Sequence, residues 1–203
     1  MPAAYASLEK RSELVRAAKE LLHEQGFHRT SLAHVAGRAG VPLGNVHYYF
    51  KTKESLAEAV IAAHEAEIRA QFQVWTDKVS DPQQRLRRLI RWPLDGAEHV
   101  VRFGCPHGSL CQELEKLEAG TPLASAGARL LAVYVDWAEV QFRALGRSTK
   151  DARALALQLV SSVQGTMLLA HTLRSAELLA EQLRRVERWL VETLSSPQAR
   201  SRA

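Results

Sequence analysis

The sequence predicts an all-α protein, in which an N-terminal three-helix helix-turn-helix domain precedes a C-terminal helical domain, with about nine helices in total. Apolar residues recur at spacings of three and four along nearly the whole chain, and no segment alternates as a strand would. Glycine, proline and hydroxyl residues interrupt this pattern where helices are expected to begin and end.

The N-terminal part is expected to contain one helix of ordinary length and two short ones. The first covers residues 8–25, and Gly26 closes it at the position of a left-handed cap. Ser31 is the expected N-cap of the second helix, which Gly40 ends after about two turns. The third begins near Pro42, a residue suited to a first helical turn. Two short helices joined at Gly40 form a helix-turn-helix.

The next helices are marked by their N-caps. Thr52 precedes a helix long enough to link two domains, and Asp81-Pro82 begins another, which Pro93 should kink or divide.

Four sequence features mark the expected turns and helix boundaries in the last part of the chain. A turn is expected over residues 103–108, and Gly120 should end the short helix that follows it. A longer helix begins at Thr121-Pro122, and a break near Arg174-Ser175 separates the last two helices.

Composition favours a cytoplasmic protein. The 203 residues are 46% hydrophobic and 24% charged, which is ordinary for a globular chain. Polar residues break the apolar stretches before the roughly 18 residues that a membrane span needs, and the N-terminus lacks a signal-peptide core. Cys105 and Cys111 are too few for a secreted disulfide framework. We therefore expect no membrane partner and a reducing compartment.

The distribution of charge says more than the net charge of +5. Residues 26–53 contain no Asp or Glu, although they contain Arg29, Arg38, Lys51 and Lys53. This stretch can approach phosphates without repulsion. A module that binds only proteins would have no reason to exclude carboxylates there.

A helix-turn-helix reads DNA by placing its second helix in the major groove. Leu43, Gly44 and Asn45 occupy the early exposed positions of that helix and would face base edges. Asn45 can pair with adenine, whereas Leu43 can contact a thymine methyl group or pack.

Other residues of this motif are suited to phosphates. Ser31 begins a helix with free backbone amides, and the Thr30 hydroxyl can add a contact. His47, Tyr48 and Tyr49 can donate to phosphates at the groove edges. Lys53 would anchor the same backbone.

Phe50 is expected to be a core aromatic residue, and Tyr48 and Tyr49 to combine packing with phosphate contact. Arg38 and Lys51 are either solvated charges or phosphate contacts.

Three runs within residues 8–56 resemble the DNA-binding sequence of the tetracycline-repressor (TetR) family: TSLAHVA at 30–36, AGV at 39–41 and GNVHYYFKTKESL at 44–56. The resemblance implies a ligand-responsive transcriptional regulator, most often a repressor. It assigns DNA contact to nine positions: Thr30, Ser31, Leu43, Gly44, Asn45, His47, Tyr48, Tyr49 and Lys53. Leu43 and His47 depart from the residues that are frequent there, so the operator sequence is not implied.

The same resemblance divides the chain by function. Residues 1–55 would be the DNA-binding domain, residues 56–195 the ligand-binding and dimerisation domain, and residues 196–203 a disordered tail. The last two helices would pair in a homodimer, which selects a palindromic operator in double-stranded DNA because its two recognition helices lie about one DNA turn apart. A small-molecule inducer that favours another spacing would release the operator.

One element in the second domain is more specific. Residues 104–110, GCPHGSL, resemble the Gly-Cys-x-x-Gly-Asn-Leu element of a TetR subgroup, some of whose members sense electrophiles or oxidants through a cysteine. Cys105 stands beside a helix N-terminus, which favours thiolate, and His107 could add positive charge. In the alternative interpretation both cysteines are small buried hydrophobic residues. Cys105, His107 and Cys111 lack the paired spacing of a structural zinc site, so we expect no metal and no cofactor.

Apolar side chains with a few polar ones suggest where a ligand would bind. The candidate ligand-binding residues are Trp92, Phe103, Cys105, His107, Tyr134, Trp137, Gln141, Gln164, Met167 and His171. Most also fit plain core packing. We expect no enzyme activity, because the chain has no phosphate-binding loop, metalloprotease motif or nucleophile elbow.

Overall fold

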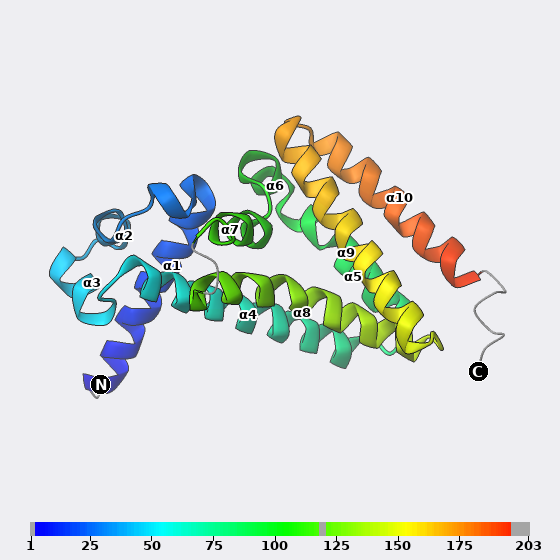
Figure 1. Ribbon diagram of the computed structural model, residues 1–203, viewed down its shortest axis with the longest axis horizontal. Coiled ribbons are helices and arrows are strands. Elements are labelled where there is room, and N and C mark those ends of the chain that lie inside the picture. The colour runs from blue at the N-terminus through cyan, green and yellow to red at the C-terminus, as the bar shows by residue number, and fades with distance from the viewer. Residues whose placement is uncertain (1–2, 118–120, 196–203) are drawn as a thin grey trace. The chain divides into compact units, whose positions relative to one another are not determined.

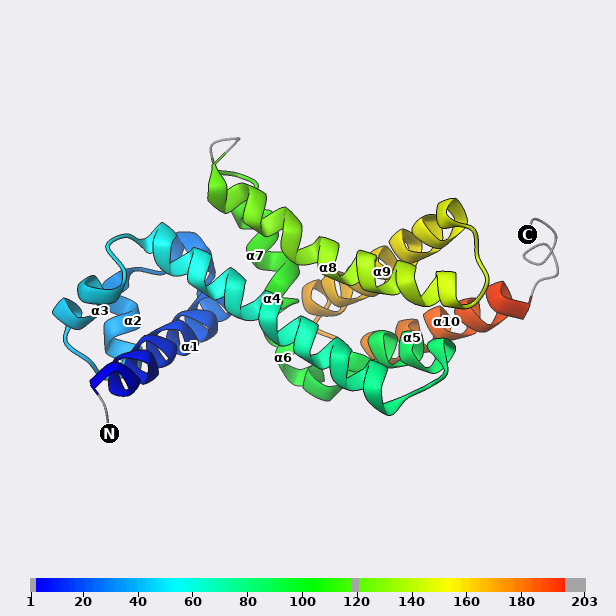
Figure 2. The same ribbon diagram turned by 90° about the horizontal axis from the view of Figure 1, so that it is seen from below.

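The computed structural model describes residues 3–117 and 121–195 (Figures 1 and 2). Its elements are α1 (Ala3–Arg29), α2 (Leu32–Ala39), α3 (Leu43–Tyr49), α4 (Lys53–Lys78), α5 (Pro82–Arg91), the 3₁₀ helix η1 (Trp92–Gly96), α6 (Ala97–Phe103), α7 (Pro106–Leu114), α8 (Pro122–Ala144), α9 (Thr149–Thr172) and α10 (Ala176–Ser195). Every one of these elements is helical, so the predicted all-α class is confirmed for the described residues. The predicted tail, residues 196–203, and the predicted helix end at Gly120 lie outside them.

The described residues form two compact units that are discontinuous in sequence. Among the described residues, one unit comprises residues 3–67, 106–117 and 121–131, and the other comprises residues 68–105 and 132–195. The first unit therefore combines the helix-turn-helix with α7 and the beginning of α8. The functional boundary between residues 55 and 56 stays a prediction.

The predicted breaks at Gly26 and Gly40 and the N-cap at Ser31 are confirmed, whereas the first helix begins at Ala3 and not near residue 8. Gly26 interrupts α1 with φ of 84°, and Gly40 ends α2 in the left-handed region with φ of 67°. The Ser31 side chain accepts a hydrogen bond from the His34 amide, as an N-cap does. Pro42 immediately precedes α3 instead of lying in its first turn.

The short helices α2 and α3 depend on packing. They contain 8 and 7 residues, below the roughly 12 to 15 that an isolated helix needs in water. Val35 and Val46 are fully buried and Phe50 is 3% exposed, so each short helix presents an apolar side to the core. Complete burial of such side chains contributes about 1.5–3 kcal/mol each. The predicted core role of Phe50 is confirmed.

The helix α4 begins with a reciprocal cap. The Ser55 amide donates to Thr52 Oγ1 over 3.1 Å, and the Thr52 amide donates to Ser55 Oγ over 3.3 Å. This pair satisfies two of the amides that a helix start leaves free. The predicted N-cap at Thr52 is confirmed.

The expected turn over residues 103–108 is mostly wrong. Only Gly104 and Cys105 lie between helices, because α7 begins at Pro106, a residue whose fixed φ and missing N–H suit a first helical turn. Pro93 has the predicted effect, since η1 separates α5 from α6. That division also gives more helices than the nine expected.

The second unit is held together by α9 and α10 and by helices that pack on them. Leu159 on α9 and Leu179 and Leu190 on α10 have no exposed surface. Arg174, with φ of 53°, lies in the break between the two helices, where the break was predicted.

Two histidines lie against each other in the first unit, one on α4 and one on α7. His64 Nδ1 and His107 Nε2 are 3.1 Å apart, so one of these nitrogens carries the shared proton. Burial, together with the charges of Lys19 and His23, lowers the pKa of His64 to about 3. Burial and the neighbouring His64 lower the pKa of His107 to about 3 as well. Both rings are therefore neutral at pH 7.

The histidine pair should make folding less stable in acid. Unfolded histidines bind a proton below about pH 6.5, whereas these folded ones do so only near pH 3, so stability is fully present above pH 6.5 and falls below it. Between pH 7 and pH 5 the loss is about 2 kcal/mol for each histidine. Urea unfolding at both pH values should show a smaller loss in His64→Gln combined with His107→Gln, and an unchanged loss in the exposed-site control His47→Gln. An equal pH dependence in all three proteins would contradict this assignment.

Candidate nucleic-acid interface and sensing residues

The helix α3 presents most of the predicted base-reading residues to solvent. Leu43 is 41% exposed and Tyr48 is 72% exposed, and Gly44, Asn45 and His47 are exposed as well. Val46 points inward and anchors the helix. The side chains on this surface contribute little to the core, so they are free to contact a partner.

Gly44 is not required by the packing of the chain. A Cβ atom built at this position meets no atom within 4 Å, and the same is true of Gly37 on α2. Glycine inside a helix costs about 1 kcal/mol relative to alanine. The conformation of the chain itself therefore gives no reason for a glycine at position 44.

Ser31 and Tyr49 lie at the edge of this surface and are half-exposed. Ser31 caps α2, whose first amides face outward from the cap. Tyr49 Oη lies 3.2 Å from Ser7 Oγ, and its ring meets the Tyr48 ring edge-on with 4.9 Å between centroids. The structure thus brings together seven of the nine predicted DNA-contacting residues.

The side chains of Thr30 and Lys53 form contacts within the protein. Thr30 is 3% exposed, and its hydroxyl donates to Gly26 O over 2.8 Å. Lys53 Nζ donates to Phe27 O over 3.2 Å and lies 4.2 Å from the centre of the Phe27 ring. In this conformation both side chains hold the turn after Gly26 instead of lying on the exposed surface.

A carboxylate from α7 completes the same turn. Glu113 Oε2 accepts from the amide of Phe27 over 2.7 Å and from that of His28 over 3.3 Å. A Cβ atom on Gly26 would lie 2.6 Å from Glu113 Oε1, so the carboxylate occupies the space that glycine leaves. Sequence analysis gave Glu113 no role, because its partners are 86 and 85 residues away in the chain.

The acid-free segment, residues 26–53, has fewer positive charges available for phosphates than its composition suggests. The Arg38 guanidinium donates to Glu24 over 2.6 Å and to Glu20 over 3.3 Å, and these contacts raise its pKa. Arg29 and Lys51 are exposed. Of the two arginines on this segment, Arg29 is therefore better placed to meet phosphates.

Three of the predicted ligand-binding residues meet in an aromatic cluster of the second unit. Trp92, Tyr134 and Trp137 surround Phe72 and Trp75 of α4, two residues that the prediction did not include. Phe72 stacks on Trp137 with 4.3 Å between ring centroids, and Trp75 meets Trp92 edge-on at 5.2 Å. Helical spacing alone does not separate ligand-binding aromatic residues from core residues such as these.

Two polar members of the predicted set, Gln141 and His171, have partners inside the protein. Gln141 is 2% exposed, accepts from Arg85 over 3.1 Å and donates to Trp137 O over 3.2 Å. His171 Nδ1 lies 3.1 Å from Val101 O.

The other members differ in burial. Met167 is 5% exposed, and Gln164 and Phe103 are half-buried.

The two cysteines are both buried, at 9% exposure for Cys105 and 4% for Cys111. The Cys111 thiol donates to Gly127 O over 3.0 Å. His107 pairs with His64 and is uncharged, so the expectation that it adds positive charge beside Cys105 is wrong. Within residues 3–117 and 121–195 no group of three or more possible ligands is placed to hold a metal ion.

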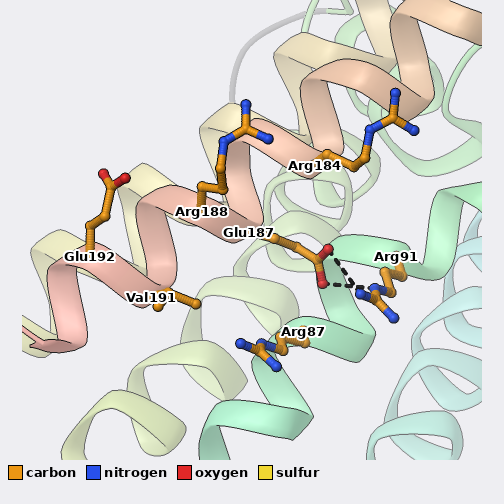
Figure 3. A pocket seen from close by; sticks show the side chains of 7 residues that line it. All are labelled: Arg87, Arg91, Arg184, Glu187, Arg188, Val191 and Glu192. Atoms are coloured by element: carbon orange, nitrogen blue, oxygen red, sulfur yellow. Dashed lines mark hydrogen bonds and ion pairs between the residues drawn. The ribbon is translucent and has the colours of Figure 1, made fainter.

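A basic surface groove lies between α5 and α10 and was not predicted. It has a volume of about 410 Å³ and is lined by Arg87, Arg91, Arg184, Glu187, Arg188, Val191 and Glu192 (Figure 3). Figure 3 shows the Glu187 carboxylate bound at two points by Arg91, over 2.7 and 3.0 Å. The groove shares no lining residue with the aromatic cluster.

Comparison with known proteins supports the interpretation of the N-terminal residues as a TetR-type helix-turn-helix. Residues 14–60 match the family model for bacterial regulatory proteins of the tetR family. The chain is 35% identical over 114 residues to the transcriptional regulator AcuR of Cereibacter sphaeroides, an alignment that covers 55% of this chain and 52% of AcuR. It is 26% identical over 185 residues to the transcriptional regulator YxaF of Bacillus subtilis, covering 86% and 93% of the two chains.

The similarity extends further in three dimensions. The crystal structure of a regulatory protein TetR from Rhodobacter sphaeroides superimposes with a TM-score of 0.75 and 28% identity, over 87% of this chain and 96% of that one. The chain spans about half the length of AcuR in their alignment. These relatives are named as regulators and not as enzymes. Residues 14–60 therefore match the tetR family of bacterial regulatory proteins, and the fold of the chain resembles that of the Rhodobacter sphaeroides regulatory protein TetR.

Proposed function

We propose that this protein is a cytoplasmic, ligand-responsive transcriptional repressor that binds a palindromic operator as a homodimer and is released by a small molecule or an electrophile. The exposed, acid-free surface of α3 carries the proposal, since Leu43, Gly44 and Asn45 are exposed at the start of that helix and a side chain at Gly44 would meet no atom of the chain. The family match of residues 14–60 supports it.

Each exposed residue has a role that its chemistry allows. Asn45 can form two hydrogen bonds with adenine, and Leu43 can contact the methyl group of thymine. His47 and Tyr48 can donate to phosphate oxygens, and the amides that follow Ser31 can receive another phosphate. Gly44 allows the helix backbone to approach the DNA closely.

The glycine on α3 provides a sharp test. We expect Gly44→Ala to stabilise the fold by about 0.5–1 kcal/mol, because alanine favours helix and the new methyl group meets open space. Selection from a random double-stranded library should yield a palindromic site for the wild type, and Gly44→Ala should bind that site at least tenfold more weakly, about 1.4 kcal/mol.

Gly37→Ala is the matched control, because Gly37 is also helical, exposed and without neighbours. It should stabilise the fold similarly and keep the wild-type affinity. Unchanged affinity in Gly44→Ala, or no selected site for the wild type, would contradict the proposal. Transcription from the selected site then separates a repressor from an activator.

The helix α9 supports the proposed dimer. Leu157, Leu168 and Leu169 on α9 and Leu173 directly after it are 47–60% exposed, and clustered exposed leucines mark interaction surfaces. By length and composition α9 is also apolar enough to cross a membrane, with 39% of its most apolar window buried. We infer that its exposed leucines pair with a second copy, as the last two helices do in the family.

A charge on α9 should separate the protomers. We expect Leu168→Glu to sediment as a monomer and to lose operator affinity, because a carboxylate buried against apolar side chains is strongly unfavourable. Val140→Glu, at a residue of α8 that is 60% exposed, is the control and should remain dimeric. A dimeric Leu168→Glu protein would exclude this face as the interface.

The sensing site is proposed to include the aromatic cluster and Cys105. Cys105 directly precedes α7, so a group attached there would have to be accommodated at the start of that helix. N-ethylmaleimide provides the probe: the sulfur adds to its carbon–carbon double bond, and the thiol proton ends on the neighbouring carbon.

We expect N-ethylmaleimide to release the wild type and Cys111→Ser from the selected DNA but not Cys105→Ser. Electrophoretic mobility of the labelled DNA measures the release. Release of Cys105→Ser by the reagent would show that Cys105 is not the sensor.

A further inference from the structure

We propose that Glu113 is a positioning residue for the DNA reader, through which α7 sets the placement of the helix-turn-helix. The proposal rests on the proposed function, because it concerns how the DNA-binding surface is held. Glu113 itself need not contact DNA.

The contacts of Glu113 lie in the turn that leads into α2. Its carboxylate accepts from the amides of Phe27 and His28, the two residues directly after the break at Gly26. Three residues later Ser31 caps α2. Whatever fixes these two amides therefore fixes the start of the first helix of the helix-turn-helix.

The rest of the turn is arranged around the same peptide groups. Phe27 O accepts from the Thr30 amide over 3.2 Å and from Lys53 Nζ over 3.2 Å. Gly26 O accepts from the Thr30 hydroxyl over 2.8 Å. The turn is thus joined to α4 by Lys53 and to α7 by Glu113.

The helix α7 is well suited to transmit a displacement, because its side chains bind three other helices of the first unit. His107 pairs with His64 of α4, Cys111 donates to Gly127 O of α8, and Glu113 binds the turn at the end of α1. Cys105 and Pro106 attach this helix to the preceding chain. A change that shifts the start of α7 would pull on the turn before α2.

The contact is strongest with a carboxylate. One oxygen accepts from two backbone amides, and hydrogen bonds to an ionised acceptor are roughly twice as strong as neutral ones. Glutamine keeps the size of the side chain but is neutral and presents one acceptor oxygen. Glu113→Gln therefore removes the strength of the contact with the smallest change in shape.

Amide exchange and operator affinity together test the inference, on the full-length protein and on the DNA selected by the wild type. We expect Glu113→Gln to speed exchange of the Phe27 and His28 amides at least tenfold and to weaken operator binding at least tenfold. Glu113→Asp should recover part of both effects, because it restores the charge. Gly26→Ala should reproduce both effects with Glu113 present, since its Cβ displaces the carboxylate.

Glu115→Gln is the matched control, because Glu115 is exposed just beyond the end of α7. It should change neither quantity. Unchanged exchange in Glu113→Gln would overturn the inference, and so would faster exchange with unchanged operator affinity, which would leave Glu113 a purely structural role. If the wild type selects no DNA, the proposed function fails and the inference about DNA fails with it, while the exchange result still reports whether Glu113 holds the turn.

Discussion

The contact between the Glu113 carboxylate and the amides of Phe27 and His28 is the constraint on which the first unit depends. A chain that leaves a helix at Gly26 exposes backbone amides with no helical partner, and burying such groups unpaired costs roughly 1–3 kcal/mol each. The carboxylate satisfies two of them from a helix that is remote in sequence. The same contact explains why Gly26 has no side chain, and it joins α7 to the helix-turn-helix within the first unit.

This arrangement separates the residues that hold the helix-turn-helix in place from the exposed residues that are proposed to contact DNA. Thr30, Lys53 and Glu113 bind the turn, and Val46 and Phe50 anchor α3 and its end. The exposed residues of α3 contribute little to the core, which is why a glycine that weakens the helix is tolerated there. The residues on the exposed surface of α3 can therefore differ in chemistry without a change in the residues that hold the helix.

Local chemistry made most of the fold predictable. The caps at Ser31 and Thr52 and the breaks at Gly40 and Pro93 follow from interactions within a few residues, and the structure confirms them. Contacts between distant segments could not be predicted.

The pairing of His64 with His107, which leaves His107 uncharged, joins two helices far apart in sequence. The burial of Thr30 and the use of Lys53 likewise depend on where Phe27 lies. The resemblance assigned both residues to DNA because spacing reports which residues share a motif, not which way each side chain points.

Hydroxyl-radical footprinting of the wild-type protein on its selected operator tests the central claim most directly. A dimer that reads DNA through α3 should protect two symmetric segments whose centres are about one helical turn, 10–10.5 base pairs, or a multiple of it apart. A single protected segment, or no protection, would contradict the assignment of a paired helix-turn-helix reader.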